Sequence, residues 1–213
     1  MGEMKGRCVI LAAGKVETPE LLRPLLRRDD WIVAADGGMR LAAALRVRPS
    51  LLVADFDSLD ESSVPEGTAV CRLPVRKDST DTLAAAVEGL HRGYRDFLLL
   101  GGTGGRLDHT LANLCVLLYL KKQGASAVLA DERNRVEIWL PGSHRVEPVA
   151  GYKFSLIPFG GEVEGLTMIN AAYPLQDARL TPDDPLGVSN EFTEVPVEIS
   201  FSRGNLLFFL SKD

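Results

Sequence analysis

The sequence predicts an α/β domain followed by a smaller all-β domain, and two observations support this prediction. In the first part of the chain, six apolar runs of strand length alternate with helical patterns. Such alternation indicates βαβ units and a mostly parallel sheet with flanking helices, a Rossmann-like arrangement. From Pro141 onward no helical pattern occurs, and short strand-like runs follow one another. We therefore expect residues 1–141 to form an α/β domain and residues 142–213 to form a β-sandwich.

The apolar runs of the first domain are mostly continuous, as expected for parallel strands that are buried on both faces. They are Cys8–Ala13, Trp31–Ala35, Leu51–Ala54, Ala69–Leu73, Phe97–Leu100 and Ala127–Ala130. The helical patterns between them are Pro19–Arg28, Met39–Leu45, Thr82–His91 and Leu111–Lys122. Gly93 and Gly124 follow the last two helices, at the position where glycine favours a helix end.

The second domain is predicted from short apolar runs, of which Val197–Phe201 is the clearest. Its apolar and polar residues alternate with a period of two, which is typical of a half-buried strand. The other runs are Lys153–Pro158, Glu162–Met168, Ala178–Leu180 and Leu206–Leu210. The sequence Arg203-Gly204-Asn205 has the composition of a hairpin turn between two of these strands.

The composition narrows the function classes. The chain has 24 Lys and Arg against 29 Asp and Glu, a net charge of −5, which argues against a broad basic surface for nucleic acid. No run approaches the roughly 20 apolar residues of a membrane span, and no signal-peptide pattern precedes the first strand. Cys8, Cys71 and Cys115 are odd in number and lack metal-ligand spacing. We expect reduced, buried thiols and a cytoplasmic protein.

Carboxylates follow two of the predicted strands directly. Asp36 comes after the run Trp31–Ala35. Asp55 and Asp57 come after the run Leu51–Ala54. Residues at the carboxyl ends of parallel strands line the crevice in which open α/β sheets bind ligands. Carboxylates gathered there repel one another unless a proton or cation intervenes, and Mg²⁺ prefers carboxylates together with phosphate oxygens. The pattern favours a metal site for a phosphorylated substrate, with a solvated acidic turn as the alternative.

A second acidic group precedes the predicted helix Thr82–His91. Asp78 and Asp81 are spaced i, i+3, which places them on one side of its first turn. Lys77 stands beside them and could neutralise a phosphate while the acids hold a metal. The alternative is helix capping, with Asp78 or Thr80 as the N-cap and Asp81 interacting with the helix dipole.

The segment Gly101–Gly105 follows the predicted strand Phe97–Leu100 and precedes a helix. Its glycines allow backbone N–H groups to approach a phosphate closely, and a helix N-terminus favours anions. Arg106 adds a guanidinium that can bind two phosphate oxygens. A permissive turn with Asp108 as the helix N-cap is the alternative. Four glycines followed by an arginine exceed what a turn requires, so the pattern favours phosphate binding.

These motifs, in this order, resemble those of the thiamine pyrophosphokinase family. The matching segments are Ala35–Gly38, Asp55–Ser58, Lys77–Asp81, Gly101–His109 with Asn113, and Gly187–Glu191. Two departures are visible. Val188 replaces the threonine of the family's Gly-Thr-Ser-Asn-Glu segment, and Ala54 replaces the glycine that usually precedes Asp-Phe-Asp-Ser. Individually the motifs are modest, but their order and spacing through both domains are specific.

The resemblance implies that the chain transfers the diphosphoryl group of ATP to the hydroxyl of thiamine, which releases AMP. It implies that residues 1–141 bind ATP and Mg²⁺, that residues 142–213 bind thiamine, and that the chain forms a homodimer with thiamine near the subunit interface. The implied metal ligands are Asp55, Asp57 and Asp81, with Asp78 as an additional or outer ligand. The implied ATP contacts are Asp36, Lys77, Gly104, Gly105, Arg106 and Asp108.

In the implied reaction, Lys77 and Arg106 stabilise charge on the phosphoryl oxygens, and Ser189 and Asn190 contact thiamine. The attacking group is the hydroxyl of the substrate, so no protein nucleophile is required. Two other functions stay open at this point. A metal-dependent transferase that uses Asp-x-Asp on a nucleotide-sugar would release a nucleoside diphosphate. A non-catalytic nucleotide-sensing module would bind its ligand without turnover and present its β domain to a partner.

Overall fold

The structure is a computed structural model that describes residues 6–56, 64–74 and 79–213. The chain separates into two compact units, Met1–Glu132 and Arg133–Asp213. The sequence places the division later, at Pro141. In the structure the strand β7 (Asn134–Trp139) pairs with β14 (Leu206–Ser211), so it belongs to the second unit and the division falls before it.

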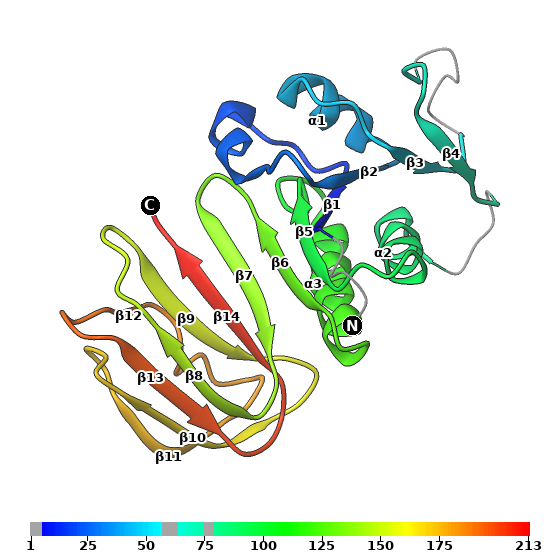
Figure 1. The fold of residues 1–213 in the computed structure, drawn as a ribbon. Coiled ribbons are helices and arrows are strands. Elements are labelled where there is room, and N and C mark those ends of the chain that lie inside the picture. The colour runs from blue at the N-terminus through cyan, green and yellow to red at the C-terminus, as the bar shows by residue number, and fades with distance from the viewer. Residues whose placement is uncertain (1–5, 57–63, 75–78) are drawn as a thin grey trace. The chain divides into compact units, whose positions relative to one another are not determined.

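The first unit contains a parallel sheet of six described strands (Figure 1). They are β1 (Cys8–Leu11), β2 (Trp31–Ala35), β3 (Leu51–Ala54), β4 (Ala69–Arg72), β5 (Asp96–Leu100) and β6 (Ser126–Ala130). Their order across the sheet is β6-β5-β1-β2-β3-β4. Each predicted strand of this domain is confirmed to within a few residues, because continuous apolar runs are what a sheet buried on both faces requires.

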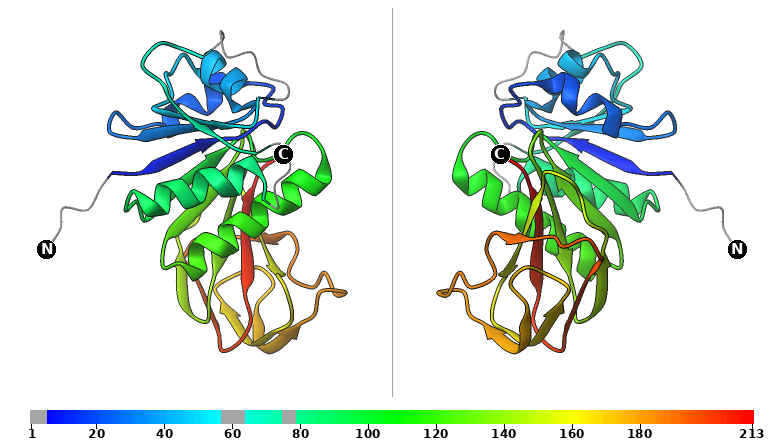
Figure 2. Two further views of the ribbon diagram at one scale, coloured as in Figure 1. Left: turned by 90° about the vertical axis from the view of Figure 1, so that its right-hand side faces the viewer. Right: turned by 90° about the vertical axis from the view of Figure 1, so that its left-hand side faces the viewer.

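Helices cover both faces of this sheet (Figure 2). They are α1 (Gly38–Leu45), α2 (Asp81–His91) and α3 (Leu107–Lys122). On one face Leu11 of β1 packs with Leu41 of α1. On the other face the Cys8 sulfur lies 3.1 Å from the position that a Cβ on Gly89 of α2 would occupy. None of the described helices is both long and apolar enough to cross a membrane.

Two helix predictions differ from the structure. Residues Pro19–Arg28 form no α-helix but two short 3₁₀ turns, η1 (Pro19–Leu21) and η2 (Arg23–Leu25). Pro24 lies in the middle of the predicted helix, where it lacks the N–H that an α-helix needs, so the chain closes i to i+3 hydrogen bonds instead. The helix α3 begins one turn before the predicted start, at Leu107, directly after the glycine-rich segment.

The strand order contains one reversal, and it decides where a ligand can bind. From β1 the chain builds outward through β2, β3 and β4, and then returns to add β5 on the other side of β1. The carboxyl ends of β1 and β5, and the loops that follow them, therefore lie at the point where the strand order reverses. Such a switch point is where open α/β sheets bind their ligands.

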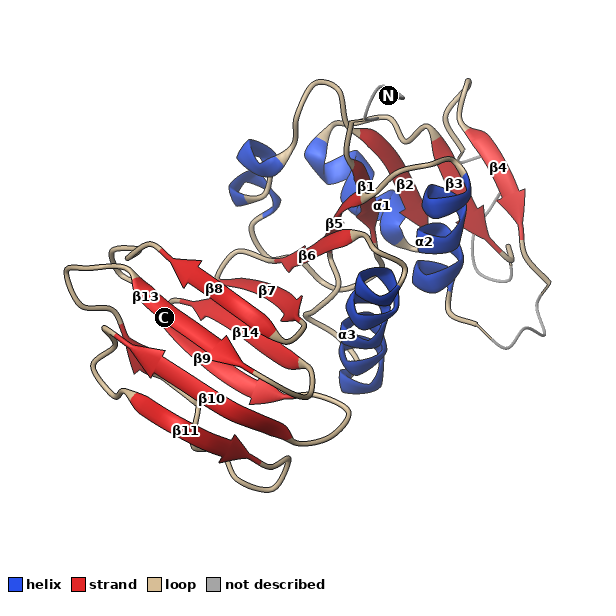
Figure 3. Cartoon of the chain, turned by 60° about the horizontal axis from the view of Figure 1, so that its bottom comes forward, coloured by secondary structure: helices blue, strands red, loops and turns tan. Residues whose placement is uncertain are grey.

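The second unit is a sandwich of two antiparallel sheets (Figure 3). Its other strands are β8 (Gly142–Val146), β9 (Lys153–Pro158), β10 (Val163–Ile169), β11 (Leu175–Leu180), β12 (Asn190–Glu191) and β13 (Val197–Phe201). One sheet has the order β12-β9-β14-β7 and the other β11-β10-β13-β8. An apolar core fills the space between them, in which the rings of Trp139 and Phe208 stack with their centroids 4.3 Å apart. The predicted β-sandwich is confirmed.

The predicted hairpin at Arg203-Gly204-Asn205 is wrong. These residues connect β13 to β14, but the two strands lie in different sheets, so the segment crosses the edge of the sandwich. Gly204 has φ +97°, and a Cβ there would lie 2.2 Å from the carbonyl oxygen of Glu162. Composition identifies a turn, but it does not decide whether the strands on either side pair.

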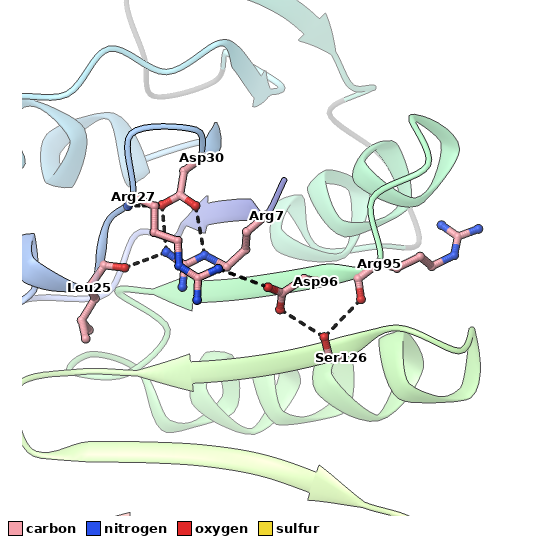
Figure 4. Close-up of polar contacts among 7 residues, drawn as sticks. All are labelled: Arg7, Leu25, Arg27, Asp30, Arg95, Asp96 and Ser126. Atoms are coloured by element: carbon pink, nitrogen blue, oxygen red, sulfur yellow. Dashed lines mark hydrogen bonds and ion pairs between the residues drawn. The ribbon is translucent and has the colours of Figure 1, made fainter. Parts of the chain in front are cut away.

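A polar network ties the amino ends of the parallel strands together (Figure 4). Arg7 donates hydrogen bonds to the two carboxylate oxygens of Asp30 at 3.0 and 2.8 Å, and one to the Leu25 carbonyl at 2.6 Å. The Asp30 side chain is 0% exposed. The Ser126 hydroxyl of β6 donates to Asp96 of β5 at 3.1 Å. This network lies at the end of the sheet opposite the switch-point crevice.

The cysteines are free thiols but are not all buried, which corrects the expectation for two of them. Cys8 is buried in the sheet, Cys71 is half-buried in β4, and Cys115 is exposed on α3. An apolar sequence context shows that a residue suits a core, whereas exposure depends on which face of its element meets another layer.

Candidate active site

A cleft of about 410 Å³ lies at the carboxyl ends of β1, β2 and β5. Its walls come from parts of five segments, at residues 12–14, 35–36, 80–82, 101–106 and 109–113. The first and fourth of these are the loops after β1 and β5, so the cleft lies at the topological switch point. The sequence predicted four of these segments as site elements, and the fold brings all four to one place.

The loops after β1 and β5 lie backbone against backbone. Gly14 N–H donates to the Gly101 carbonyl at 2.8 Å, and Lys15 N–H donates to the Gly104 carbonyl at 2.9 Å. A Cβ on Gly14 would lie 1.9 Å from the Thr103 oxygen, and a Cβ on Gly104 would lie 2.0 Å from the Lys15 oxygen. Only glycine allows this approach, which leaves the neighbouring backbone of both loops at the cleft wall.

Gly105 has a different role from Gly104. A Cβ on Gly105 would meet nothing within 4 Å, and Gly104 but not Gly105 has a positive φ, +74°. Both residues were predicted from the same motif to contact a phosphate. Of these two residues, the fold requires a glycine only at position 104, while Gly105 lines the cleft.

Asp36 stands in the cleft directly after β2, with a φ of +45°. Its Oδ1 atom is buried and has no hydrogen-bond partner among the described residues. A buried carboxylate oxygen without a partner costs free energy, because it has lost its hydration without compensation. The oxygen is therefore suited to receive a donor or a cation that a ligand brings into the cleft.

Asp55 follows β3 at the same edge of the sheet. The register pairs Ala35 of β2 with Val53 of β3, so the residues after both strands leave the sheet side by side. The next residue, Phe56, has φ +61° and packs against the small cluster beneath it, with the Arg72 guanidinium 4.6 Å from its ring centroid. Phe56 thereby anchors the turn that presents the acidic motif. The second acid of this motif, Asp57, lies outside the described residues.

The helix α2 begins in the cleft wall. Thr80 is its N-cap, since the Thr80 hydroxyl accepts a hydrogen bond from Leu83 N–H at 3.2 Å. Capping is therefore done by Thr80, one of the two candidates from the sequence. Asp81 is the first helical residue and lines the cleft. Lys77 and Asp78, predicted to bind ATP and to assist the metal, lie outside the described residues.

Arg106 and Asp108 form an exposed ion pair. The Arg106 guanidinium donates to both Asp108 oxygens, at 3.1 and 2.6 Å. These hydrogen bonds raise the pKa of Arg106 and lower the pKa of Asp108. Arg106 lines the cleft and Asp108 does not. The suggestion that Asp108 caps α3 is wrong, because Arg106 occupies the N-cap position and Asp108 lies within the first helical turn.

Asn113 of α3 is a site residue to which sequence reasoning assigned no role. It is 6% exposed, and its side-chain N–H donates to the Gly102 carbonyl at 2.8 Å at the floor of the cleft. A polar residue within an apolar helix was the available signal. Within residues 6–56, 64–74 and 79–213, no group of three or more His, Cys, Asp and Glu side chains is arranged to hold a metal.

In the second unit, Ser189 lines a pocket of about 620 Å³ together with Tyr152 and Phe192. Ser189 has φ +60°, and its N–H donates to the Ser155 hydroxyl at 3.0 Å. The neighbouring Asn190 points into the protein instead and is 5% exposed.

The Asn190 side chain clamps the backbone of another loop. Its oxygen accepts from the N–H groups of Tyr173, at 3.1 Å, and Glu191, at 2.8 Å. Its nitrogen donates to the Tyr173 carbonyl at 2.7 Å. These bonds occupy the polar groups of the amide inside the fold.

Two family models match the chain, one for each unit. "Thiamin pyrophosphokinase, catalytic domain" matches residues 22–129, and "Thiamin pyrophosphokinase, vitamin B1 binding domain" matches residues 143–206. The chain belongs to the thiamine pyrophosphokinase family. The cleft described above lies within and beside the first match, and the pocket beside Ser189 overlaps the second.

Individual members of the family resemble the chain over most of its length. It is 29% identical over 188 residues to the thiamine pyrophosphokinase of Bacillus subtilis, which covers 86% of this chain and 87% of that protein. It is 24% identical over 169 residues to thiamin pyrophosphokinase 1 of Caenorhabditis elegans, covering 75% and 69% of the two chains.

Solved structures of the family share the whole fold. The thiamine pyrophosphokinase of Bacillus subtilis superposes with a TM-score of 0.88 at 26% identity, over 98% of this chain and 100% of that one. That of Geobacillus thermodenitrificans gives 0.84 at 29% identity, over 98% of each chain. Yeast thiamin pyrophosphokinase, at 14% identity, shares the fold with a TM-score of 0.80, over 99% of this chain and 87% of that one.

The function is therefore that of a thiamine pyrophosphokinase, a transferase. This confirms the resemblance carried by the sequence motifs. The nucleotide-sugar transferase and the non-catalytic sensing module are not favoured.

Proposed function

We propose that this thiamine pyrophosphokinase transfers the diphosphoryl group of ATP to the hydroxyl of thiamine, releasing AMP, and that it requires Mg²⁺. The observation that supports this reaction is the switch-point cleft. Two glycine loops form one side of it, and a buried carboxylate oxygen without a described partner stands on the other. N–H groups suit phosphate oxygens, and a carboxylate suits a cation or a hydroxyl.

In this proposal the phosphates of ATP lie along the loops after β1 and β5. The close packing at Gly14 and Gly104 keeps side chains away from the loop backbones, so a polyphosphate can approach the N–H groups. Arg106 is exposed at the rim and reaches phosphate oxygens by exchanging one or both bonds to Asp108. Lys77 would add a further positive charge. Gly105, which has no side chain, would leave room for the phosphates beside the loop.

The acidic residues would hold Mg²⁺ at Asp55, Asp57 and Asp81, with Asp78 in support. The described part of the site fits such an ion, because Asp36 Oδ1 lacks a partner and Asp81 lines the same cleft. When bound, Mg²⁺ neutralises phosphate charge and aligns the phosphoryl group for attack.

The nucleophile in the proposed reaction is the hydroxyl of thiamine, which must lose a proton as it attacks. Asp36 and Asp81 are the carboxylates in the described cleft wall that can accept it. Arg106, together with Lys77, would stabilise the charge that develops on the phosphoryl oxygens and on AMP.

Thiamine would bind at Ser189 and Asn190, which have different parts in this proposal. Ser189 lines a pocket that Tyr152 and Phe192 also line, and aromatic residues suit the aromatic rings of thiamine. Asn190 shapes the pocket by clamping the Tyr173 backbone, because its own polar groups are already engaged.

We also propose a cytoplasmic homodimer. On α3, Leu107 is 84% exposed and Leu111 is 56% exposed, and Cys115 is exposed four residues further on. Residues at this spacing share one helix face, and an exposed apolar face is typical of a protein interface. A second copy would cover this face in the proposed homodimer. Free thiols are consistent with the cytoplasm.

The reaction is tested by incubating the protein with ATP, thiamine and Mg²⁺ and separating the products by chromatography. We expect AMP and thiamine diphosphate in equal amounts, and neither after removal of divalent ions with EDTA. Release of a nucleoside diphosphate, or ATP binding without turnover, would contradict the proposal.

The role of the buried carboxylate is tested with Asp36→Asn, which keeps the shape of the side chain. Asparagine tolerates a positive φ, so only the charge is lost. We expect turnover to fall by about 100-fold, the scale for losing one charge-stabilising group. Asp177→Asn is the matched control, since Asp177 also has a positive φ, +48°, and lies in the second unit. Equal activity of both variants would contradict the assignment.

The dimer is tested by mixing two inactive variants, Asp36→Asn and Ser189→Lys, where the added lysine blocks the pocket and repels the cation of thiamine. If each active site combines a cleft from one chain with a pocket from the other, each mixed dimer keeps one intact site, and an equal mixture recovers up to about a quarter of full activity. No recovery after demonstrated subunit exchange would contradict a shared site.

A further inference from the structure

Two adjacent carboxylates at the carboxyl end of β6 are engaged with the walls of the cleft. Asp131 and Glu132 follow the last residue of the strand, Ala130. Neither is among the residues that line the cleft. Each nevertheless accepts hydrogen bonds from one of the two loops that form it, and sequence reasoning assigned neither residue a role.

Asp131 holds the glycine-rich loop. The Thr103 hydroxyl donates to its Oδ2 atom at 2.8 Å, and the contact is partly buried. Thr103 is the one residue between Gly101 and Gly105 that has a side chain, so it offers the only side-chain attachment within that loop. Its carbonyl is the atom that a Cβ on Gly14 would approach to 1.9 Å. Fixing Thr103 therefore fixes the contact between the two loops.

Glu132 holds the other loop. Its Oε1 atom accepts the N–H groups of Glu17 at 2.8 Å and Thr18 at 2.9 Å. Hydrogen bonds from N–H groups to a carboxylate are stronger than those between neutral groups. They anchor the chain directly after Lys15, whose own N–H donates to Gly104 of the glycine-rich loop.

We propose that Asp131 and Glu132 are positioning residues that set the arrangement of the two ATP-binding loops from outside the cleft. The inference rests on the proposed function, because it takes the cleft to be the ATP site. Both loops consist mainly of glycine and other small residues near the cleft, and such segments lose much conformational freedom when a ligand orders them. Attachment to the end of a strand removes that freedom before ATP binds.

The described hydrogen bonds join Asp131 to Thr103 and Glu132 to Glu17 and Thr18, so both residues act on the two loops of the cleft. Loosening the loops should therefore raise the KM for ATP while kcat stays within about twofold and the KM for thiamine is unchanged. A residue that supports only the fold would change thermal stability without this selective change in KM.

The decisive variant is Thr103→Val, which removes the hydroxyl and keeps the volume. We expect the KM for ATP to rise about tenfold, equivalent to about 1.4 kcal/mol. Thr103→Ser restores the hydroxyl and should return the KM to within about twofold of the unaltered enzyme. Thr68→Val is the matched control, because Thr68 donates a similar bond to the Pro49 carbonyl at 2.9 Å, away from the cleft. It should leave the KM for ATP unchanged.

Glu132 is tested in the same way with two variants. Glu132→Gln keeps an oxygen that can accept both N–H groups, whereas Glu132→Met keeps the length and removes the acceptor. We expect Glu132→Met to raise the KM for ATP several-fold and Glu132→Gln to have the smaller effect. Circular dichroism on each variant identifies any loss of fold.

The outcomes separate this inference from the proposed function. If the unaltered protein does not bind ATP in calorimetry, the proposed function fails and the inference fails with it. If the unaltered enzyme is active and Thr103→Val, correctly folded, has the same KM for ATP, the inference alone is overturned. An equal rise in KM for Thr103→Val and Thr68→Val would also overturn it.

Discussion

Gly104→Ala adds one methyl group at the point where the two cleft loops touch. The backbone at Gly104 has φ +74°, and the added Cβ would lie 2.0 Å from the Lys15 carbonyl oxygen. Real Cβ atoms do not approach other atoms within 3.0 Å, and the opposing atom here belongs to backbone rather than to a flexible side chain. The loops must therefore move apart.

The cost of this change has two parts. An L-residue other than glycine in the left-handed region costs roughly 1–2 kcal/mol. Moving the Lys15 backbone away breaks its N–H bond to the Gly104 carbonyl, which is 2.9 Å long and contributes about 0.5–1.5 kcal/mol. If ATP binding must restore the original arrangement, these effects weaken it by about 2–3 kcal/mol, or roughly 30- to 150-fold.

The neighbouring glycine provides the control. Gly105→Ala adds the same methyl group one residue later, where it meets nothing within 4 Å. Titration calorimetry with ATP, on protein shown to be folded by circular dichroism, measures both variants. We expect weak binding for Gly104→Ala and near-normal binding for Gly105→Ala. Normal binding by Gly104→Ala would refute the argument that loop contact shapes the site, and equal losses would refute the distinction between the two glycines.

Three further predictions concern stability and thiol chemistry. Arg7→Met leaves the buried carboxylate of Asp30 unpaired and should cost about 3–5 kcal/mol in urea unfolding, part of which Asp30→Leu in the same chain should restore. Burial, together with the charge of Asp30, raises the pKa of Cys8 above its ordinary 9.0. The unfolded chain releases this proton first, so stability should fall as the pH rises past that value, and a flat profile up to about pH 11 would contradict this. Mass spectrometry after brief treatment with a thiol reagent at neutral pH should find Cys8 unlabelled in the folded protein and labelled once the chain is unfolded in urea.

Local sequence placed some of the predicted site residues correctly at the cleft, but it did not show the direction of every side chain. Asp36 and Asp81 were predicted from their positions at the ends of a strand and the start of a helix, and both line the cleft. Asn190 was predicted to contact thiamine, but its amide turns inward to the Tyr173 backbone, seventeen residues away in sequence. A sequence motif shows that a residue matters in a family without showing which way its side chain points.

Contacts between distant segments account for the elements that sequence reasoning missed. The bond from Thr103 to Asp131 spans 28 residues, and those from Glu17 and Thr18 to Glu132 span 115 and 114. No spacing or composition signal connects such pairs. The hairpin prediction at Arg203-Gly204-Asn205 was wrong for the same reason. The strands on either side, β13 and β14, pair with strands of different sheets rather than with each other.

The sequence by itself determined the alternation of strands and helices in the first unit, the change to β-strands in the second, and the motifs that identify the family. Apolar runs, helix ends and glycine-rich turns are properties of neighbouring residues, and hydrophobic burial and backbone sterics act on them directly. Only the tertiary structure decided that the loops after β1 and β5 meet, that Gly104 rather than Gly105 must be glycine, and that Asp131 and Glu132 support the cleft. These features depend on strand order, because the reversal at β1 and β5 brings together segments that the sequence keeps far apart.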